Sequence, residues 1–260
     1  DIEGVWSDYY TITIDKDNPP VALFNLDKAM ISTTDLLKVK DQSYPQSFST
    51  ITNWHWIVSK VNANGTETNI YTKNATESNT GTGSLAGYDK HVKYSYNSIG
   101  KYRIYLRVKN SNGLWSDGGT DGGYNLSSFY SRDFEVDSLP TASFSIEKSP
   151  IYVEEVLKLK DLSVATGTSH LAKWHWVVKK LNPDGGVPSG NIQDAMFLDS
   201  NTGTGDMAGY DVNVKTVYGD KGPGIYRIYL RVMNRNGMWS DGGSDSSYNL
   251  NSMYYEDLEV

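Results

Sequence analysis

The chain has no cysteine among its 260 residues. This absence excludes disulfide bonds, thiolate nucleophiles, cysteine-ligated zinc and iron–sulfur centres. The hydrophobic core alone must therefore stabilise the fold.

Positive charge is also scarce, because 24 Lys and Arg residues stand against 31 Asp and Glu residues and leave a net charge of −7 at pH 7. Binding to nucleic acid depends on clustered Lys and Arg side chains that displace counterions from the phosphates. No apolar run approaches the roughly 18 residues that a membrane-spanning helix requires. We therefore expect no nucleic-acid partner and no membrane span in this segment.

The chain opens with Asp-Ile-Glu-Gly and lacks a starting Met with a basic, apolar leader. We expect it to be a segment of a longer protein, so the missing leader does not argue against secretion. Tyr outnumbers Phe by 19 to 6. A composition rich in Tyr and without Cys is compatible with an all-β surface protein.

The main feature of the sequence is an internal repeat. Three segments recur with nearly the same residues: 53–58 at 173–178, 79–83 at 201–205, and 102–108, unchanged, at 226–232. The offset between the copies grows along the chain, which indicates small insertions in loops of the second copy that are rich in Gly and Pro.

A partial third copy stands at the front, where residues 4–8 match 113–117. We predict that 1–18 hold the last strand of a preceding repeat and a linker, that 19–138 form a first domain and that 139–260 form a second. Each link ends in Pro, which fixes φ and restrains the residue before it. We therefore expect short, stiff links.

The hydrophobic period within each repeat is two residues, which predicts β-strands. In 102–109 the apolar residues Tyr102, Ile104, Leu106 and Val108 alternate with Arg103, Tyr105, Arg107 and Lys109. The same spacing directs paired tryptophans to one side of a strand, so we assign to the core Trp54, Trp56, Trp174 and Trp176. Short strands separated by turns rich in Asn and Gly predict an all-β fold of two tandem Ig-like antiparallel β-sandwiches.

Each repeat resembles a PKD domain, the Ig-like module of bacterial surface proteins, secreted hydrolases and polycystins. The resemblance lies in five ordered elements. They are Pro-x-Ala-x-Phe at 20–24 and 140–144, Asp-x-Ser at 41–43 and 161–163, the Trp strand at 54–56 and 174–176, Gly-x-Tyr with its alternating run to Val at 100–108 and 224–232, and Asn-x-x-Gly at 110–113 and 234–237.

The resemblance implies an Ig-like fold and a location outside the cell. One departure concerns calcium, because the family usually follows its Trp strand with Gly-Asp-Gly. Here residues 57–60 read Ile-Val-Ser-Lys and residues 177–180 read Val-Val-Lys-Lys. Any calcium role of that Asp does not carry over to this chain.

An enzyme needs a nucleophile, a base and an orienting group that converge, or an open metal site. Of the four histidines only His55 and His175 occupy equivalent places. Each stands between two core tryptophans, so we predict that both face solvent. No complete catalytic set recurs in both copies, and we predict no catalytic residues.

A Gly-rich loop with two carboxylates follows each long strand. Asp117 and Asp121 recur as Asp241 and Asp245, in each case four residues apart. Carboxylates, hydroxyls and carbonyls on such a permissive backbone are ligands that suit Ca²⁺. The alternative is an ordinary turn-rich loop, in which Asp and Gly serve turn geometry.

The surplus of tyrosine suggests a second kind of site. Tyr105, Tyr124, Tyr229 and Tyr248 are candidates for a surface on which sugar rings stack. Exposed Tyr is also common on sheets that bind nothing.

We therefore expect a monomeric, non-catalytic module of a longer, extracellular or surface-attached bacterial protein. It would act as a spacer, stalk or adhesive repeat, with the other domains of the same chain as its partners. The alternative is a module that binds carbohydrate or an extracellular protein, with calcium as a stabilising ion. The fold alone does not separate these functions, because such sandwiches host both.

Overall fold

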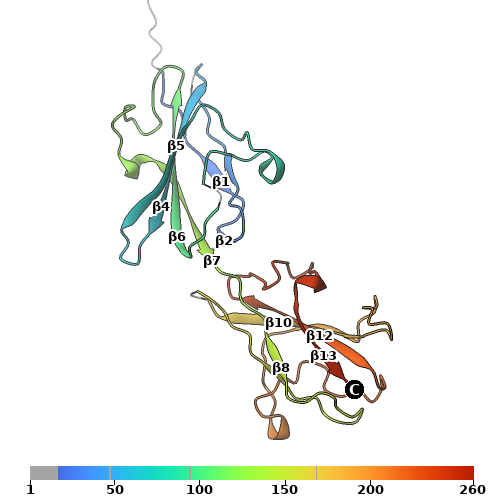
Figure 1. Cartoon of the computed structure of the whole chain (residues 1–260). Coiled ribbons are helices and arrows are strands. Elements are labelled where there is room, and N and C mark those ends of the chain that lie inside the picture. Colours follow the sequence, from blue (N-terminus) through green and yellow to red (C-terminus); the bar gives the residue numbers. More distant parts are fainter. Residues whose placement is uncertain (1–16, 47, 94, 168) are drawn as a thin grey trace, which may run out of the picture. The chain divides into compact units, whose positions relative to one another are not determined.

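The computed structural model describes residues 17–46, 48–93, 95–167 and 169–260. The remnant strand expected at 5–14 lies outside the described residues. Strands and four short 3-10 helices make up the regular structure of the described chain (Figure 1). The prediction of an all-β fold is confirmed. No helix of the described part is long and apolar enough to cross a membrane.

The chain divides into two compact units. The first unit includes Leu36–Ser95 and Lys101–Phe134 together with the segment before Met30. The second includes Glu135–Val260, and the short segments Met30–Asp35 and Tyr96–Gly100 group with it.

The first half of the chain carries a five-stranded sheet and a two-stranded sheet. The large sheet has the order β2 (Met30–Ser32), β7 (Tyr130–Asp137), β6 (Gly100–Asn110), β4 (Ile51–Val61) and β5 (Glu67–Ala75), and the small one pairs β1 (Phe24–Leu26) with β3 (Val39–Asp41). The central strand β4 pairs antiparallel with both β5 and β6. Strand β2 departs from the predicted antiparallel pattern, because it lies at the sheet edge beside β7 and runs in the same direction.

The second unit repeats this plan with fewer strands. Its large sheet has the order β11 (Gln193–Phe197), β10 (Leu171–Lys180), β12 (Ile225–Asn234) and β13 (Tyr254–Glu259), and its small sheet pairs β8 (Phe144–Ile146) with β9 (Leu159–Asp161). The short 3-10 helices are Gly83–Leu85, Leu126–Ser128, Gly205–Met207 and Leu250–Ser252.

The core of each unit contains a tryptophan of the large sheet against a phenylalanine of the small sheet. The rings of Trp56 and Phe24 are 5.2 Å apart edge to face, and those of Trp176 and Phe144 are also 5.2 Å apart. All four tryptophans assigned to the core are buried. The alternation of apolar residues thus directs one face of each large sheet onto its small sheet.

The outer tryptophan of each pair has its polar edge satisfied inside the protein. Trp54 and Trp174 donate their indole N–H groups to Asp41 and Asp161, each over 2.7 Å. A buried indole N–H without an acceptor would cost free energy. The Asp of the repeated Asp-x-Ser element therefore positions the Trp strand.

In each unit the first residue of the repeated Asn-Thr-Gly-Thr-Gly segment forms hydrogen bonds with the backbone of the aspartate that accepts from the tryptophan. Asn201 has a φ of 52°, and its side chain binds both the N–H and the C=O of Asp161 over 2.8 and 2.9 Å. Asn79 binds Asp41 in the same way. At Gly203 a Cβ would lie 2.2 Å from the carbonyl oxygen of Met207, so the close approach of the loop requires glycine.

Candidate functional site

The face of each large sheet opposite the tryptophans carries a histidine paired with an arginine. Register places His55 opposite Arg107 on β4 and β6, and His175 opposite Arg231 on β10 and β12. All four side chains are buried. The prediction that the histidines face solvent is wrong, because the Gly-rich loop and its aromatic side chains cover this face as well.

Each buried arginine binds the Gly-rich loop that covers it. The guanidinium carbon of Arg107 lies 4.0 Å from the ring centre of Trp115, and Nη1 donates to the carbonyl of Thr120 over 3.0 Å. Arg231 repeats these contacts with Trp239 at 4.1 Å and with the carbonyl of Ser244 at 3.0 Å. A cation over an indole face and a charged hydrogen bond both anchor the loop.

The first aspartate of each loop forms a buried ion pair with this arginine. Nη1 of Arg107 lies 3.5 Å from Asp117 Oδ2, and Nη1 of Arg231 lies 3.4 Å from Asp241 Oδ2. These side chains are at most 1 % exposed. Such a pair is costly to break from one side, because the remaining charge stays buried without compensation.

The second aspartate of each loop lies at the surface. Asp121 accepts from the indole N–H of Trp115 over 2.7 Å and from Lys109 over 2.8 Å. Asp245 accepts from the indole N–H of Trp239 over 2.8 Å and from Lys173 over 2.6 Å. These bonds hold the indole ring over the guanidinium.

The four carboxylates proposed as calcium ligands therefore all accept from protein donors. Two face guanidinium groups, and two bind an indole and an ammonium group. Among the described residues no group of three or more His, Asp or Glu side chains is placed to hold a metal ion. The arrangement anchors the loops through protein cations.

The four tyrosines proposed as a sugar-stacking surface lie in two different environments. Tyr105 and Tyr229 are buried, because Tyr105 packs on Ile57 and Phe129, and Tyr229 packs on Val177 and Met253. That part of the proposed surface is not presented to a ligand. Tyr124 is 46 % exposed. Its counterpart Tyr248 stands edge to face with His175, with the ring centres 4.8 Å apart.

The surroundings of both histidines favour the neutral form of the ring, because they lower its pKa. Burial lowers the pKa of His55, and the neighbouring charge of Arg107 lowers it further against the opposing effect of Asp117. Burial also lowers the pKa of His175, although the hydrogen bond to Asp194 acts in the other direction. A neutral ring beside a guanidinium accepts from it, as Nδ1 of His175 does from Arg231 Nε over 2.9 Å.

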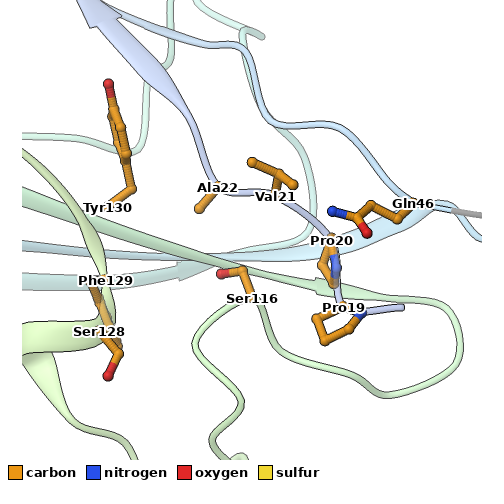
Figure 2. A pocket seen from close by; sticks show the side chains of 9 residues that line it. All are labelled: Pro19, Pro20, Val21, Ala22, Gln46, Ser116, Ser128, Phe129 and Tyr130. Atoms are coloured by element: carbon orange, nitrogen blue, oxygen red, sulfur yellow. The ribbon is translucent and has the colours of Figure 1, made fainter. Parts of the chain in front are cut away.

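Two hollows lie in the first unit. One has a volume of about 210 Å³, and its lining includes His55, Arg107, Trp115 and Asn74. The other, of about 510 Å³, lies beside Pro19 and Pro20, where the described part of this unit begins. Figure 2 shows its lining of prolines, small apolar side chains, two serines, Gln46 and two aromatic rings, with no charged group among these nine residues.

Sequence reasoning missed the two buried arginines, which alternation assigns to the solvent face. A signal was present, because each histidine and its cross-strand arginine recur unchanged in both copies.

No protein-family model matches the chain, and a comparison with curated proteins gives no match either.

Proposed function

We propose that the chain is a pair of non-catalytic Ig-like β-sandwich modules of the PKD kind. In this proposal they serve as a spacer or adhesive repeat of a longer extracellular or surface-attached bacterial protein. The observation that carries the proposal is that, in both copies, the buried arginine and the loop aspartates bind one another and the covering loop. Arg231 binds Asp241, His175 and the loop carbonyl of Ser244, so these groups are engaged in holding the sheet and the loop together.

The end of the chain supports a role under load. Val260 exchanges two backbone hydrogen bonds with Gly224, over 2.8 and 2.9 Å, and β13 continues this antiparallel ladder along β12. A force that pulls β13 away must break the hydrogen bonds of this ladder before the strand separates from β12. Buried cation-π contacts then resist separation of the covering loop from the sheet.

Single-molecule pulling of the full chain between handles tests the proposal. We expect two successive unfolding events, each releasing roughly 400 Å of chain, because about 120 residues extend by at most 3.3–3.6 Å each. The Arg231→Met variant should lower the force of one event and leave the other unchanged. Smooth extension without force peaks, in the unmodified chain, would rule out a load-bearing module.

A further inference from the structure

The loop that follows the edge strand of the large sheet is fastened in the same way in both units. In the first unit the hydroxyl of Tyr71 on β5 donates to the carbonyl oxygen of His91 over 2.9 Å. In the second unit the side-chain amide of Gln193 on β11 donates to the carbonyl oxygen of Asn213 over 2.6 Å. Register places Tyr71 and Gln193 at equivalent positions of their strands. The two units therefore share this frame of strand and loop.

A third hollow of the first unit is lined by β5 and by this loop. Its volume of about 470 Å³ is within the roughly 300–1,000 Å³ that small-molecule sites occupy. Two lysines line it, and none of the described residues that line it is an Asp or a Glu. The lining consists of Tyr71, Lys73, Thr82, Leu85, Lys90 and His91. In a chain with a net charge of −7, this hollow thus has a lining of the opposite sign.

The second unit lacks both lysines at the equivalent positions. Register sets Ala195 of β11 in the place of Lys73. Along the loop, Val212 stands in the place of Lys90. The second unit fastens its loop without these two ammonium groups. The lysines of the first unit are therefore not needed to hold the frame.

Both lysines retain the capacity to bind an anion. Lys73 is exposed and has no ion pair among the described residues. Nζ of Lys90 lies 2.6 Å from Oε1 of Glu77, and these two side chains are 44 % and 47 % exposed. An ion pair that is so exposed to solvent contributes little free energy, so the carboxylate of a ligand can compete with Glu77. A hollow lined by charges of one sign also raises the local concentration of counter-ions.

The remaining lining groups suit a sugar ring. The ring of Tyr71 and the side chain of Leu85 provide apolar surface for the C–H groups of a sugar. Thr82 is exposed, and a threonine hydroxyl both donates and accepts hydrogen bonds, as sugar hydroxyls do. Binding to a long run of phosphates needs clustered cations, whereas two lysines suit one or two carboxylates.

We infer that this hollow binds a sugar acid, whose carboxylate lies against the ammonium groups of Lys73 and Lys90. A free sugar acid and the uronic acid unit of a polysaccharide both carry this chemistry. The inference goes beyond the proposed mechanical role and does not depend on it.

The test follows the backbone amide NMR signals of the full chain at neutral pH during titration with sodium galacturonate and with its linear tetramer. Galactose, and sodium phosphate at matched ionic strength, serve as controls. We expect saturable shifts of Lys73, Thr82 and Lys90 with both acids, no such shift of Thr204 in the second unit, and none with the controls. Tighter binding of the tetramer identifies a polysaccharide as the better ligand, and equal binding identifies the free sugar acid.

A matched pair of variants makes the test specific. The double variant Lys73→Ala and Lys90→Val carries the residues of the second unit, and it should weaken binding by about tenfold or more because both charged contacts are lost. The control is Lys101→Ala, which removes an exposed lysine outside the hollow and should leave binding unchanged. Melting curves show that both variants are folded.

Three results would overturn the inference. They are the absence of any saturable shift in the unmodified chain, an equal response to galactose or phosphate, and undiminished binding by the folded double variant.

Discussion

The buried arginines make use of the geometry that distinguishes arginine from lysine. Arg231 donates from Nε to His175 and from Nη1 to the carbonyl of Ser244, while its flat face lies on Trp239. A lysine has one compact ammonium group and cannot make all these contacts at once. The residue thus joins a strand, a loop and an aromatic ring.

Replacing this arginine should be strongly destabilising. We expect Arg231→Met to lower the free energy of unfolding by about 3–5 kcal/mol, because Asp241 would remain buried without its cation. Urea denaturation measures the change. The control is Arg235→Met, which removes an exposed arginine of the same unit and should leave stability within about 0.5 kcal/mol. Equal effects of the two substitutions would contradict the role given to Arg231.

The histidines should make the fold sensitive to acid. The pKa of His175 is lowered in the folded chain, first by burial, whereas the unfolded chain titrates near 6.5. As pH falls through 6.5 toward the folded pKa, the unfolded chain binds a proton that the folded chain does not, so the free energy of unfolding decreases. Urea denaturation at about pH 7.5 and about pH 5.5 should show this decrease, and His175→Gln should reduce it. If the free energy of unfolding decreases as much in His175→Gln as in the unmodified chain, His175 is not the cause of the acid sensitivity.

At the scale of strands, the lysine that binds the second loop aspartate comes from a different strand in each unit. Register pairs Asn53 with Lys109 across β4 and β6, and Lys173 with Met233 across β10 and β12. The ammonium group that binds the loop aspartate comes from β6 in the first unit and from β10 in the second. Either member of this cross-strand pair can therefore supply the ammonium group that binds the loop aspartate.

Exchange within this pair should be tolerated. The hydrogen bond from Lys109 lowers the pKa of Asp121, and the indole of Trp115 adds to this effect. Lys109→Met should raise the pKa of Asp121 toward its ordinary value, which carboxyl NMR titration measures. Adding Asn53→Lys should lower it again, because the cation then comes from β4 as in the second unit. A double variant that titrates like the single one would show that the strands are not interchangeable.

At the scale of the whole molecule, local patterns were enough to predict the all-β fold and the inward face of the strand at 102–108. The run from Tyr102 to Val108 alternates, and its apolar residues are buried. The burial of Arg107 could not be predicted from alternation, because it depends on how the loop that begins at Trp115, eight residues further along the chain, folds back over the sheet. The partners of the loop carboxylates were missed for the same reason, since Lys173 reaches Asp245 across 72 residues of sequence.

Calcium should have no effect on the thermal stability of the full chain. All four loop carboxylates already accept from protein donors, and a ligand that binds only the folded state would raise the melting temperature by mass action. Melting curves with and without millimolar Ca²⁺ are therefore expected to coincide. An increase that disappears in the double variant Asp117→Asn and Asp241→Asn would instead identify the loops as calcium sites.

The exchanged lysines also bear on how such repeats diverge. A comparison made one position at a time counts Asn53 against Lys173 and Lys109 against Met233 as two unrelated differences. Taken as a cross-strand pair, they preserve a single bond to the loop aspartate. Paired substitutions of this kind let distant copies keep one architecture while their aligned residues cease to match. An alignment score that treats cross-strand pairs together would therefore detect similarity between such repeats that a score for single positions misses.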